Sequence, residues 1–477
     1  MLNPTLRSEL GSGSWQRKRE SSPSIDHSAS FIPVLFSGGD SRIVSDPHTG
    51  LNKYLCPTMP TPGLVCLSSC TASPISALGF DKAAAAFFDI VQAPSPRQQA
   101  DRLMALTGGI EARLLRYFGI GALAQVFLCP SGTDALLTTA MLIAAERPDE
   151  AMTAILPSAS ETGTGVPMAA MGRVFDGPHS GTPLIECAGK AVEISLRLAD
   201  GSPRCEGEVN KAFADATAAA KGNVIVYLTH STKTGLIAPV SPPSGADVIV
   251  DACQARIAPE TVAAYLRRGW PVVVTGSKFF GGPTFSGAVL FPRARLPAIG
   301  RRLLPPALCD DGKLGTALRW TAALAALDAF EPLSVKTAEV LSNRAAAVER
   351  ALASNPALVP IGGLQPHGFG WADLPSIFTF GVRDPMDRGR LLSAAELRPL
   401  YKQLAQMGVL LGQPVNLGPF GGLRLAFGAR DLLDLIGLSE SGDSGLERVF
   451  TALEEATTPS RHPANETSRQ RDNFGRL

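Results

Sequence analysis

Two short runs of β-branched residues in this chain each end at a polar group that is costly to bury. The run at 248–250 stops at Asp251, and the run at 272–274 opens into Thr275-Gly276-Ser277-Lys278. Apolar runs without polar alternation are typical of strands that are covered on both faces. Similar runs alternate with helical patterns along the chain, which predicts an α/β fold with a mostly parallel sheet. Such sheets bind ligands outside the carboxyl ends of their strands, where Asp251 and Lys278 both fall.

The predicted elements divide the chain into two parts. Before Pro332, strands are expected at 125–128, 154–156, 223–228, 247–250, 271–274 and 288–291, and helices at 132–146, 208–221, 259–267 and 315–330. After Pro332 the pattern becomes α+β, with helices at 335–354, 394–407 and 444–455 and strands at 376–382, 409–411 and 423–427. We therefore expect a large domain at 41–330 and a smaller C-terminal domain at 331–457.

The remaining segments carry few signals of regular structure. Residues 1–40 are expected to form a disordered arm, because their first thirty residues are rich in serine and contain no apolar run of the kind a secretory signal needs. Residues 41–80 are rich in proline, serine and cysteine and are expected to wrap over the large domain. The polar stretch 458–477 is expected to be a loose tail.

Composition excludes several classes of partner. A formal net charge of +1 over 477 residues gives no electrostatic reason to bind nucleic acid or an anionic membrane. No apolar stretch reaches the length of a membrane span. The eight cysteines are dispersed, which is unlike a secreted disulfide framework and favours a reducing, cytoplasmic location. Cys66 and Cys70 have no histidine nearby, so no metal site is predicted.

An acid and a lysine at one sheet edge suit pyridoxal phosphate (PLP). Its aldehyde condenses with a lysine amine, and its ring nitrogen stays protonated against a carboxylate. We therefore predict that Lys278 is the catalytic lysine that forms the Schiff base and that Asp251 is the acid, with Gln254 reaching the ring's phenolic oxygen. When each residue is considered alone, Asp251 could instead be a cap at the end of a strand, and Lys278 could be a solvated residue of a loop. Lys233 is an alternative lysine, but it lies in mid-loop.

Hydroxyl groups near these residues predict a phosphate site. In Ser131-Gly132-Thr133 a strand feeds a turn of small residues that opens a helix, which points backbone N–H groups and hydroxyls at one place. Thr275 and Ser277 would add two more hydroxyls. The alternative is that Ser131 or Thr133 only caps the helix. The order of hydroxyl turn, acid and lysine along the chain strengthens the PLP interpretation beyond any one motif.

On these residues the chain resembles the class V branch of the fold type I PLP enzymes, which includes cysteine desulfurases, serine and alanine–glyoxylate aminotransferases, and kynureninases. The resemblance runs from Pro130 to Asp431 and implies a large domain with a mostly parallel seven-stranded sheet and a smaller C-terminal α+β domain. The matching residues are Ser131-Gly132-Thr133, the stretch from His230 to Gly235 followed by Pro239, Asp251 with Gln254, and Lys278.

The resemblance also implies two roles that the residues alone do not. Gly315-Thr316 is similar to a pair that reaches the phosphate of a neighbouring subunit, which implies a homodimer with shared active sites. Arg424, in the stretch 423–428, is similar to an arginine that grips the substrate carboxylate. A guanidinium can bind a carboxylate through two parallel hydrogen bonds, which is the physical reason for that choice.

Three departures from the family pattern affect the expected reaction. Ser277 stands where desulfurases carry a histidine before the lysine. Glu161-Thr162 stands near the usual ring-stacking position in place of an aromatic residue or histidine. No cysteine follows Cys309, so the mobile persulfide cysteine of desulfurases is missing.

We therefore expect a PLP-dependent aminotransferase that acts on an amino acid as its small-molecule substrate. A PLP-dependent lyase that catalyses β-elimination or decarboxylation is the alternative. A non-catalytic relative of the same fold is a third interpretation, which the retention of both Asp251 and Lys278 disfavours.

Overall fold

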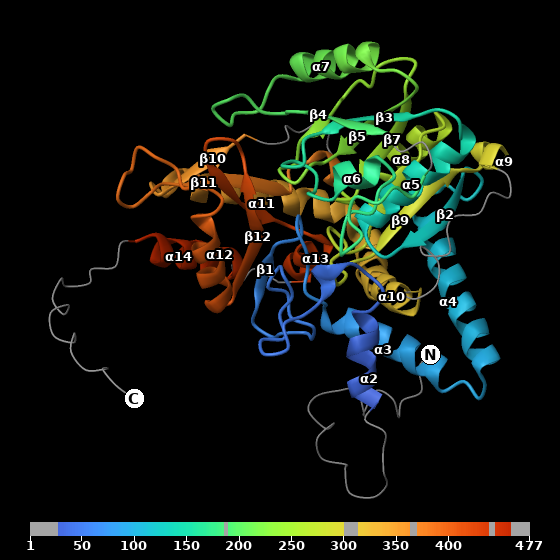
Figure 1. The fold of residues 1–477 in the computed structure, drawn as a ribbon. Helices are drawn as coiled ribbons and strands as arrows, with labels where there is room; N and C mark the ends of the chain where they lie inside the picture. Colours follow the sequence, from blue (N-terminus) through green and yellow to red (C-terminus); the bar gives the residue numbers. More distant parts are fainter. Residues whose placement is uncertain (1–26, 186–188, 300–312, 363–369, 438–443, 459–477) are drawn as a thin grey trace, which may run out of the picture.

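Two β-sheets flanked by helices form the protein, as the computed structural model shows for residues 27–185, 189–299, 313–362, 370–437 and 444–458 (Figure 1). The larger sheet has the strand order β2-β9-β8-β7-β5-β3-β4, and β6 pairs with β5 as an eighth strand. Only β9 and β6 run antiparallel to their neighbours. The expectation of a mostly parallel sheet with seven strands along its main path is therefore confirmed. Its strands are β2 (Ala124–Cys129), β3 (Met152–Pro157), β4 (Lys190–Ile194), β5 (Asn223–His230), β6 (Ile237–Ala238), β7 (Asp247–Ala252), β8 (Val272–Thr275) and β9 (Gly287–Pro292).

Both faces of the large sheet are buried, as the apolar runs predicted. Along β7, Val248 and Val250 enter one core cluster, whereas Ile249 enters another on the opposite face. On β8, Val272 and Val274 enter the same core cluster as Val248 and Val250. The helices that belong to this part are α4 (Pro96–Tyr117), α5 (Gly132–Glu146), α6 (Val166–Ala170), α7 (Glu206–Ala219), α8 (Pro259–Arg267), α9 (Leu296–Ile299) and α10 (Lys313–Phe330).

The smaller sheet has the strand order β1-β12-β13-β11-β10. Its last four strands come from the predicted C-terminal domain and pair antiparallel. β1 comes from far upstream and pairs parallel to β12, with Val65 opposite Val409. The elements are β1 (Val65–Leu67), α11 (Ser334–Ser354), β10 (Leu358–Ile361), β11 (Ile377–Val382), α12 (Leu397–Gln406), β12 (Val409–Asn416), β13 (Gly421–Ala426), α13 (Ala429–Gly437) and α14 (Ser444–Thr457).

Two predictions for the N-terminal region are wrong. The arm was expected to be disordered to residue 40, but α2 (His27–Leu35) is helical, because Phe31 and Leu35 pack into a core with α3 (Ala77–Val91) and α10. Residues 1–26 and the tail from 459 lie outside the described residues. The segment 41–80 was assigned wholly to the large domain, but its residues 65–67 extend the smaller sheet as β1.

No helix within the described ranges is both long enough and apolar enough to cross a lipid bilayer.

Candidate active site

Asp251 and Lys278 lie at the same edge of the large sheet. Asp251 is the last but one residue of β7, opposite Thr229 of β5 and Val273 of β8. Lys278 stands in the loop that follows β8, three residues beyond Thr275. Burial lowers the pKa of Lys278, and the negative charge of Asp251 offsets this in part, so the two groups lie within electrostatic reach of each other. The structure therefore brings together the acid and the lysine that the sequence singled out.

The amine of Lys278 is desolvated and has no close partner among the described residues. Burial lowers its pKa below the usual value for lysine, and the neighbouring Cys253, Asp251 and Cys70 offset this only in part. It makes no hydrogen bond or ion pair that would hold it protonated. A lysine amine activated in this way is a nucleophile for carbonyl groups.

The loop that carries Lys278 is packed tightly beneath it. A Cβ at Gly276 would lie 2.6 Å from the Cβ of Ala323 on α10, so a side chain would clash there. The next residue, Ser277, is buried, and its hydroxyl has no hydrogen-bond partner. An unsatisfied buried hydroxyl costs about 1–3 kcal/mol, and that of Ser277 is free to donate to a ligand. Thr275 differs, because its hydroxyl donates to the Cys253 carbonyl at 2.6 Å.

Ser131 caps α5, which was the alternative interpretation of this turn from the sequence. Its Oγ accepts from the Asp134 N–H at 3.2 Å and donates to the Asp134 carboxylate at 2.6 Å. Burial raises the pKa of Asp134 to about 6. Gly132 must lack a side chain, since a Cβ there would lie 2.7 Å from the Sγ of Cys253. The turn therefore packs directly against the segment that follows Asp251.

A cation that the sequence did not indicate, Arg42, lies against the predicted phosphate turn. Its Nη2 donates to Ser131 Oγ at 3.3 Å and to Thr133 Oγ1 at 3.4 Å. Its charge is paired with Asp40, and the ring of Phe285 lies 4.8 Å from its guanidinium. Arg42 precedes the turn by 89 positions, so no local motif could have connected the two.

Gln254 and Arg256 form a buried network behind Asp251. The side-chain amide of Gln254 donates to the Cys70 carbonyl at 3.0 Å, and its oxygen accepts from Arg256 at 2.9 Å. Arg256 also donates to Ser376 at 2.8 Å, and to Ser69 and the Phe427 carbonyl, each at 2.8 Å. Burial lowers the pKa of Arg256 to about 10. Sequence reasoning missed this arginine, which ties the large sheet to the smaller one.

Arg424 lies on β13 at the border between the two sheets and is only 2% exposed. It donates to Thr71 Oγ1 at 2.8 Å and to the Lys233 carbonyl at 3.2 Å, and it also contacts the Gln413 carbonyl. Its Nε has no partner. All of these partners are neutral, so the guanidinium lacks a compensating anion among the described residues. Buried charges are normally paired, which makes this position suitable for a carboxylate ligand.

Glu161, near the predicted ring-stacking position, belongs to a structural network. Its carboxylate accepts from Arg197 at 2.6 Å, from Thr232 at 2.8 Å and from Thr234 at 2.6 Å. Arg197 also donates to Thr234 at 2.8 Å. These bonds fix the turn after β5, and they leave the carboxylate of Glu161 with no evident role toward a ring.

Two residues implied by the resemblance have other contacts. Thr316 lies on α10, and its hydroxyl accepts from Arg319 at 3.2 Å. A role toward a neighbouring subunit stays a prediction. His230, the last residue of β5, lies 3.3 Å from the Tyr265 hydroxyl through Nδ1.

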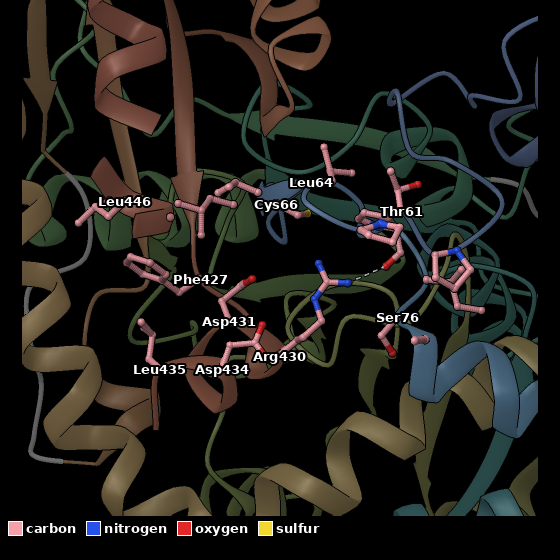
Figure 2. Close-up of a pocket in the computed structure, with 18 residues that line it drawn as sticks. Thr61, Leu64, Cys66, Ser76, Phe427, Arg430, Asp431, Asp434, Leu435 and Leu446 are labelled. Atoms are coloured by element: carbon pink, nitrogen blue, oxygen red, sulfur yellow. Dashed lines mark hydrogen bonds between the residues drawn. The ribbon is translucent and has the colours of Figure 1, made fainter. Parts of the chain in front are cut away.

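A separate cavity of about 420 Å³ contains none of the predicted site residues. It lies among the segment 60–67, α13 and α14, and Figure 2 shows the Arg430 side chain reaching into it. Arg430 donates to the Pro74 carbonyl at 3.3 Å, and burial raises the pKa of the neighbouring Asp431 to about 6. Nothing in this cavity resembles the lysine and acid pair.

The architecture has counterparts among solved structures. The cysteine desulfurase CsdA from Escherichia coli, in an S-sulfonic acid form, is 16% identical; the match covers 83% of this chain and 94% of CsdA, with a TM-score of 0.53. The cystine C-S lyase C-DES, in complex with its product cysteine persulfide, is 13% identical over 83% of this chain and 98% of its own, with a TM-score of 0.52.

The chain has the fold of the type I PLP-dependent enzymes. A mutant of C-DES with glycine linked covalently to its PLP cofactor matches over 83% of this chain and 97% of its own, with a TM-score of 0.53 and 13% identity. No family model and no curated protein matches the sequence. The expected fold class is thus confirmed. Sequence identities this low support a shared fold and not a shared activity.

Proposed function

We propose that this protein is a PLP-dependent enzyme that acts on an amino acid, and that it is an aminotransferase. The observation that carries the proposal is the desolvated Lys278 amine beside Asp251 at the carboxyl edge of a type I sheet. No hydrogen bond or ion pair with another described residue accounts for the positions of both Asp251 and Lys278. When bound, PLP would supply an electron sink for the carbanion formed at the substrate Cα.

The residues present fit such a cofactor. Asp251 would hold the proton on the ring nitrogen, and the unpartnered Ser277 hydroxyl would donate to the phosphate. Lys278 would hold the cofactor covalently and then, once released by the substrate amine, move the α-proton as a general base. Its lowered pKa favours the unprotonated form that this step needs.

Arg424 would bind the substrate α-carboxylate. Its guanidinium is buried and has only neutral partners, and its free Nε is a further donor. A carboxylate at this position would orient the amino acid so that its α-hydrogen faces Lys278. It would also remove the cost of an uncompensated buried cation.

Incubation of the PLP-reconstituted protein with a panel of amino acids tests the proposed reaction. An aminotransferase is expected to convert the bound cofactor into pyridoxamine phosphate and to release the matching oxo acid in equal amount. Chromatography of the extracted cofactor and assay of the oxo acid measure both products. Ammonia release without pyridoxamine phosphate would contradict aminotransfer.

Lyase chemistry is the second candidate, because the matched C-DES is a cystine C-S lyase. The same residues could serve it, since the proton is removed from the same carbon. The absence of any cysteine after Cys309 disfavours a desulfurase with a late persulfide cysteine but not an elimination. A lyase would release pyruvate and ammonia while PLP stays unchanged, together with cysteine persulfide from cystine or sulfide from cysteine.

Arg42 is expected to contribute to phosphate binding. Its guanidinium lies 3.3 Å from Ser131 Oγ and 3.4 Å from Thr133 Oγ1, so an anion on these hydroxyls would meet it. Replacement by methionine should weaken PLP binding about 10- to 100-fold, as expected for the loss of a hydrogen bond to a charged group. Titration of the apoprotein, followed by absorbance, measures the dissociation constant.

Pyridoxal without its phosphate is the control ligand for Arg42→Met. Its affinity should change little, because only the phosphate contact is removed. An equal loss for PLP and pyridoxal would assign Arg42 to the stability of the N-terminal segment instead.

A further inference from the structure

Lys233 is a second lysine of the site, in the turn between β5 and β6. Its backbone N–H donates to the Glu161 carbonyl at 2.8 Å, and its own carbonyl accepts from Arg424 at 3.2 Å. Its Nζ donates to the Ala159 carbonyl at 3.0 Å, just beyond the end of β3. The residue is therefore held from both sides, between the edge of the large sheet and β13.

Other basic groups lie within electrostatic reach of this turn. Among them Arg424 lowers the pKa of Lys233 most, followed by Lys278, and Arg42 acts more weakly. The acid that faces it is Glu161, but that carboxylate already accepts from Arg197, from Thr232 and from Thr234. The described residues thus provide no acid that is free to pair with Lys233.

The proposed function supplies an anionic or covalent partner for the other cations. Arg424 would take the α-carboxylate, Lys278 would hold the cofactor, and Arg42 would meet the phosphate. Lys233 is left with a neutral carbonyl. Burial, together with the positive charges of Arg424 and Lys278, lowers its pKa to about 7. Without an anionic partner, the amine meets the cost of burial by losing its proton.

We propose that Lys233 binds a second acidic group on the substrate, so that the accepted amino acid carries an anionic side chain such as a carboxylate or a sulfinate. This inference rests on the proposed function, because it uses Arg424 for the α-carboxylate. Arg424 donates to the backbone carbonyl of Lys233, and its charge also acts on the Lys233 amine, so both basic groups belong to the same turn. That arrangement suits two acidic groups joined by a short carbon chain.

Pairs of acidic amino acids and their amides test the inference on the PLP-reconstituted full-length protein. Aspartate is compared with asparagine, and glutamate with glutamine, through the absorbance change of the bound cofactor. The wild type should prefer the acid in at least one pair. Lys233→Met should weaken binding of that acid roughly 30-fold, since the partner of a buried charge is removed. Its affinity for the amide should stay unchanged.

The pH dependence gives a second readout with a defined sign. An acidic group binds the protonated amine, so binding raises the pKa of Lys233 from its free value of about 7. The preference for acid over amide should be constant below that pH and should decline as pH rises above it. Taking the ratio within a pair cancels the titration of Lys278. Lys233→Arg should keep the preference and remove this pH dependence, because arginine stays charged.

Three results would overturn the inference. Equal affinity of the wild type for acids and amides would do so, as would a Lys233→Met protein that loses both kinds of ligand equally, because the lysine would then only hold the turn. A wild type whose bound cofactor responds to no amino acid would overturn the proposed function together with this inference. A cofactor that responds to amides and acids alike would leave the proposed function standing.

Discussion

Lys278→Ala is expected to abolish covalent attachment of PLP and to lower turnover roughly 1,000-fold, because one residue serves as both the attachment point and the proton carrier. The cofactor should still bind, since Arg42 and the unpartnered Ser277 hydroxyl remain. Borohydride reduction followed by peptide mass spectrometry measures the attachment directly. In the wild type, the reduced adduct should map to the peptide that contains Lys278.

The matched control for this experiment is Lys233→Met. Lys233 is the other partly buried lysine of the site, and its Nζ is bound to the Ala159 carbonyl, whereas that of Lys278 has no hydrogen bond to a described residue. Attachment at Lys278 should persist in this variant. An adduct on Lys233 in the wild type would show that the chemical assignment of the two lysines is reversed.

Asp251→Asn is expected to lower turnover by about 100- to 1,000-fold, as for the loss of one member of a buried charge pair. A neutral amide would no longer hold the proton on the cofactor ring, so the electron sink would weaken. Steady-state turnover with the best amino acid of the panel measures the effect. Covalent attachment at Lys278 should remain detectable, which separates this variant from Lys278→Ala.

Asparagine is suited to this test because it keeps the local structure. The Oδ1 of Asp251 accepts from the Cys253 N–H at 3.1 Å, and an asparagine oxygen can accept the same bond. The melting temperature should therefore change little. Turnover close to that of the wild type would mean that Asp251 serves only to cap the end of β7.

The large sheet and its acid–lysine edge could be predicted because their signals are local. The helices α5 and α8 begin and end at the predicted residues, and β7 and β8 differ from prediction by no more than two residues at either end. Each of these elements could be recognised from consecutive residues, without knowledge of its neighbours in the fold. The long helix α4 was missed although Ser95 caps it and Pro96 opens it, a pattern that marks a helix start.

The rest of the site depends on contacts between distant segments. Arg42 meets Ser131, and Arg256 meets Ser376, through folding of the whole chain. A single sequence shows that an arginine is present but not which buried groups surround it. Glu161 illustrates the same limit. Its place near the usual ring-stacking position was predicted, but the hydrogen bond that its carboxylate accepts from Arg197 was not.

The parallel pairing of β1 with β12 has a consequence for how the chain is made. Val65 leaves the ribosome long before Val409, its partner, has been synthesised. Until then the edge of β1 exposes unpaired backbone groups that could join a strand of another nascent chain. β1 cannot pair until β12 has emerged, so the smaller sheet is completed late in synthesis.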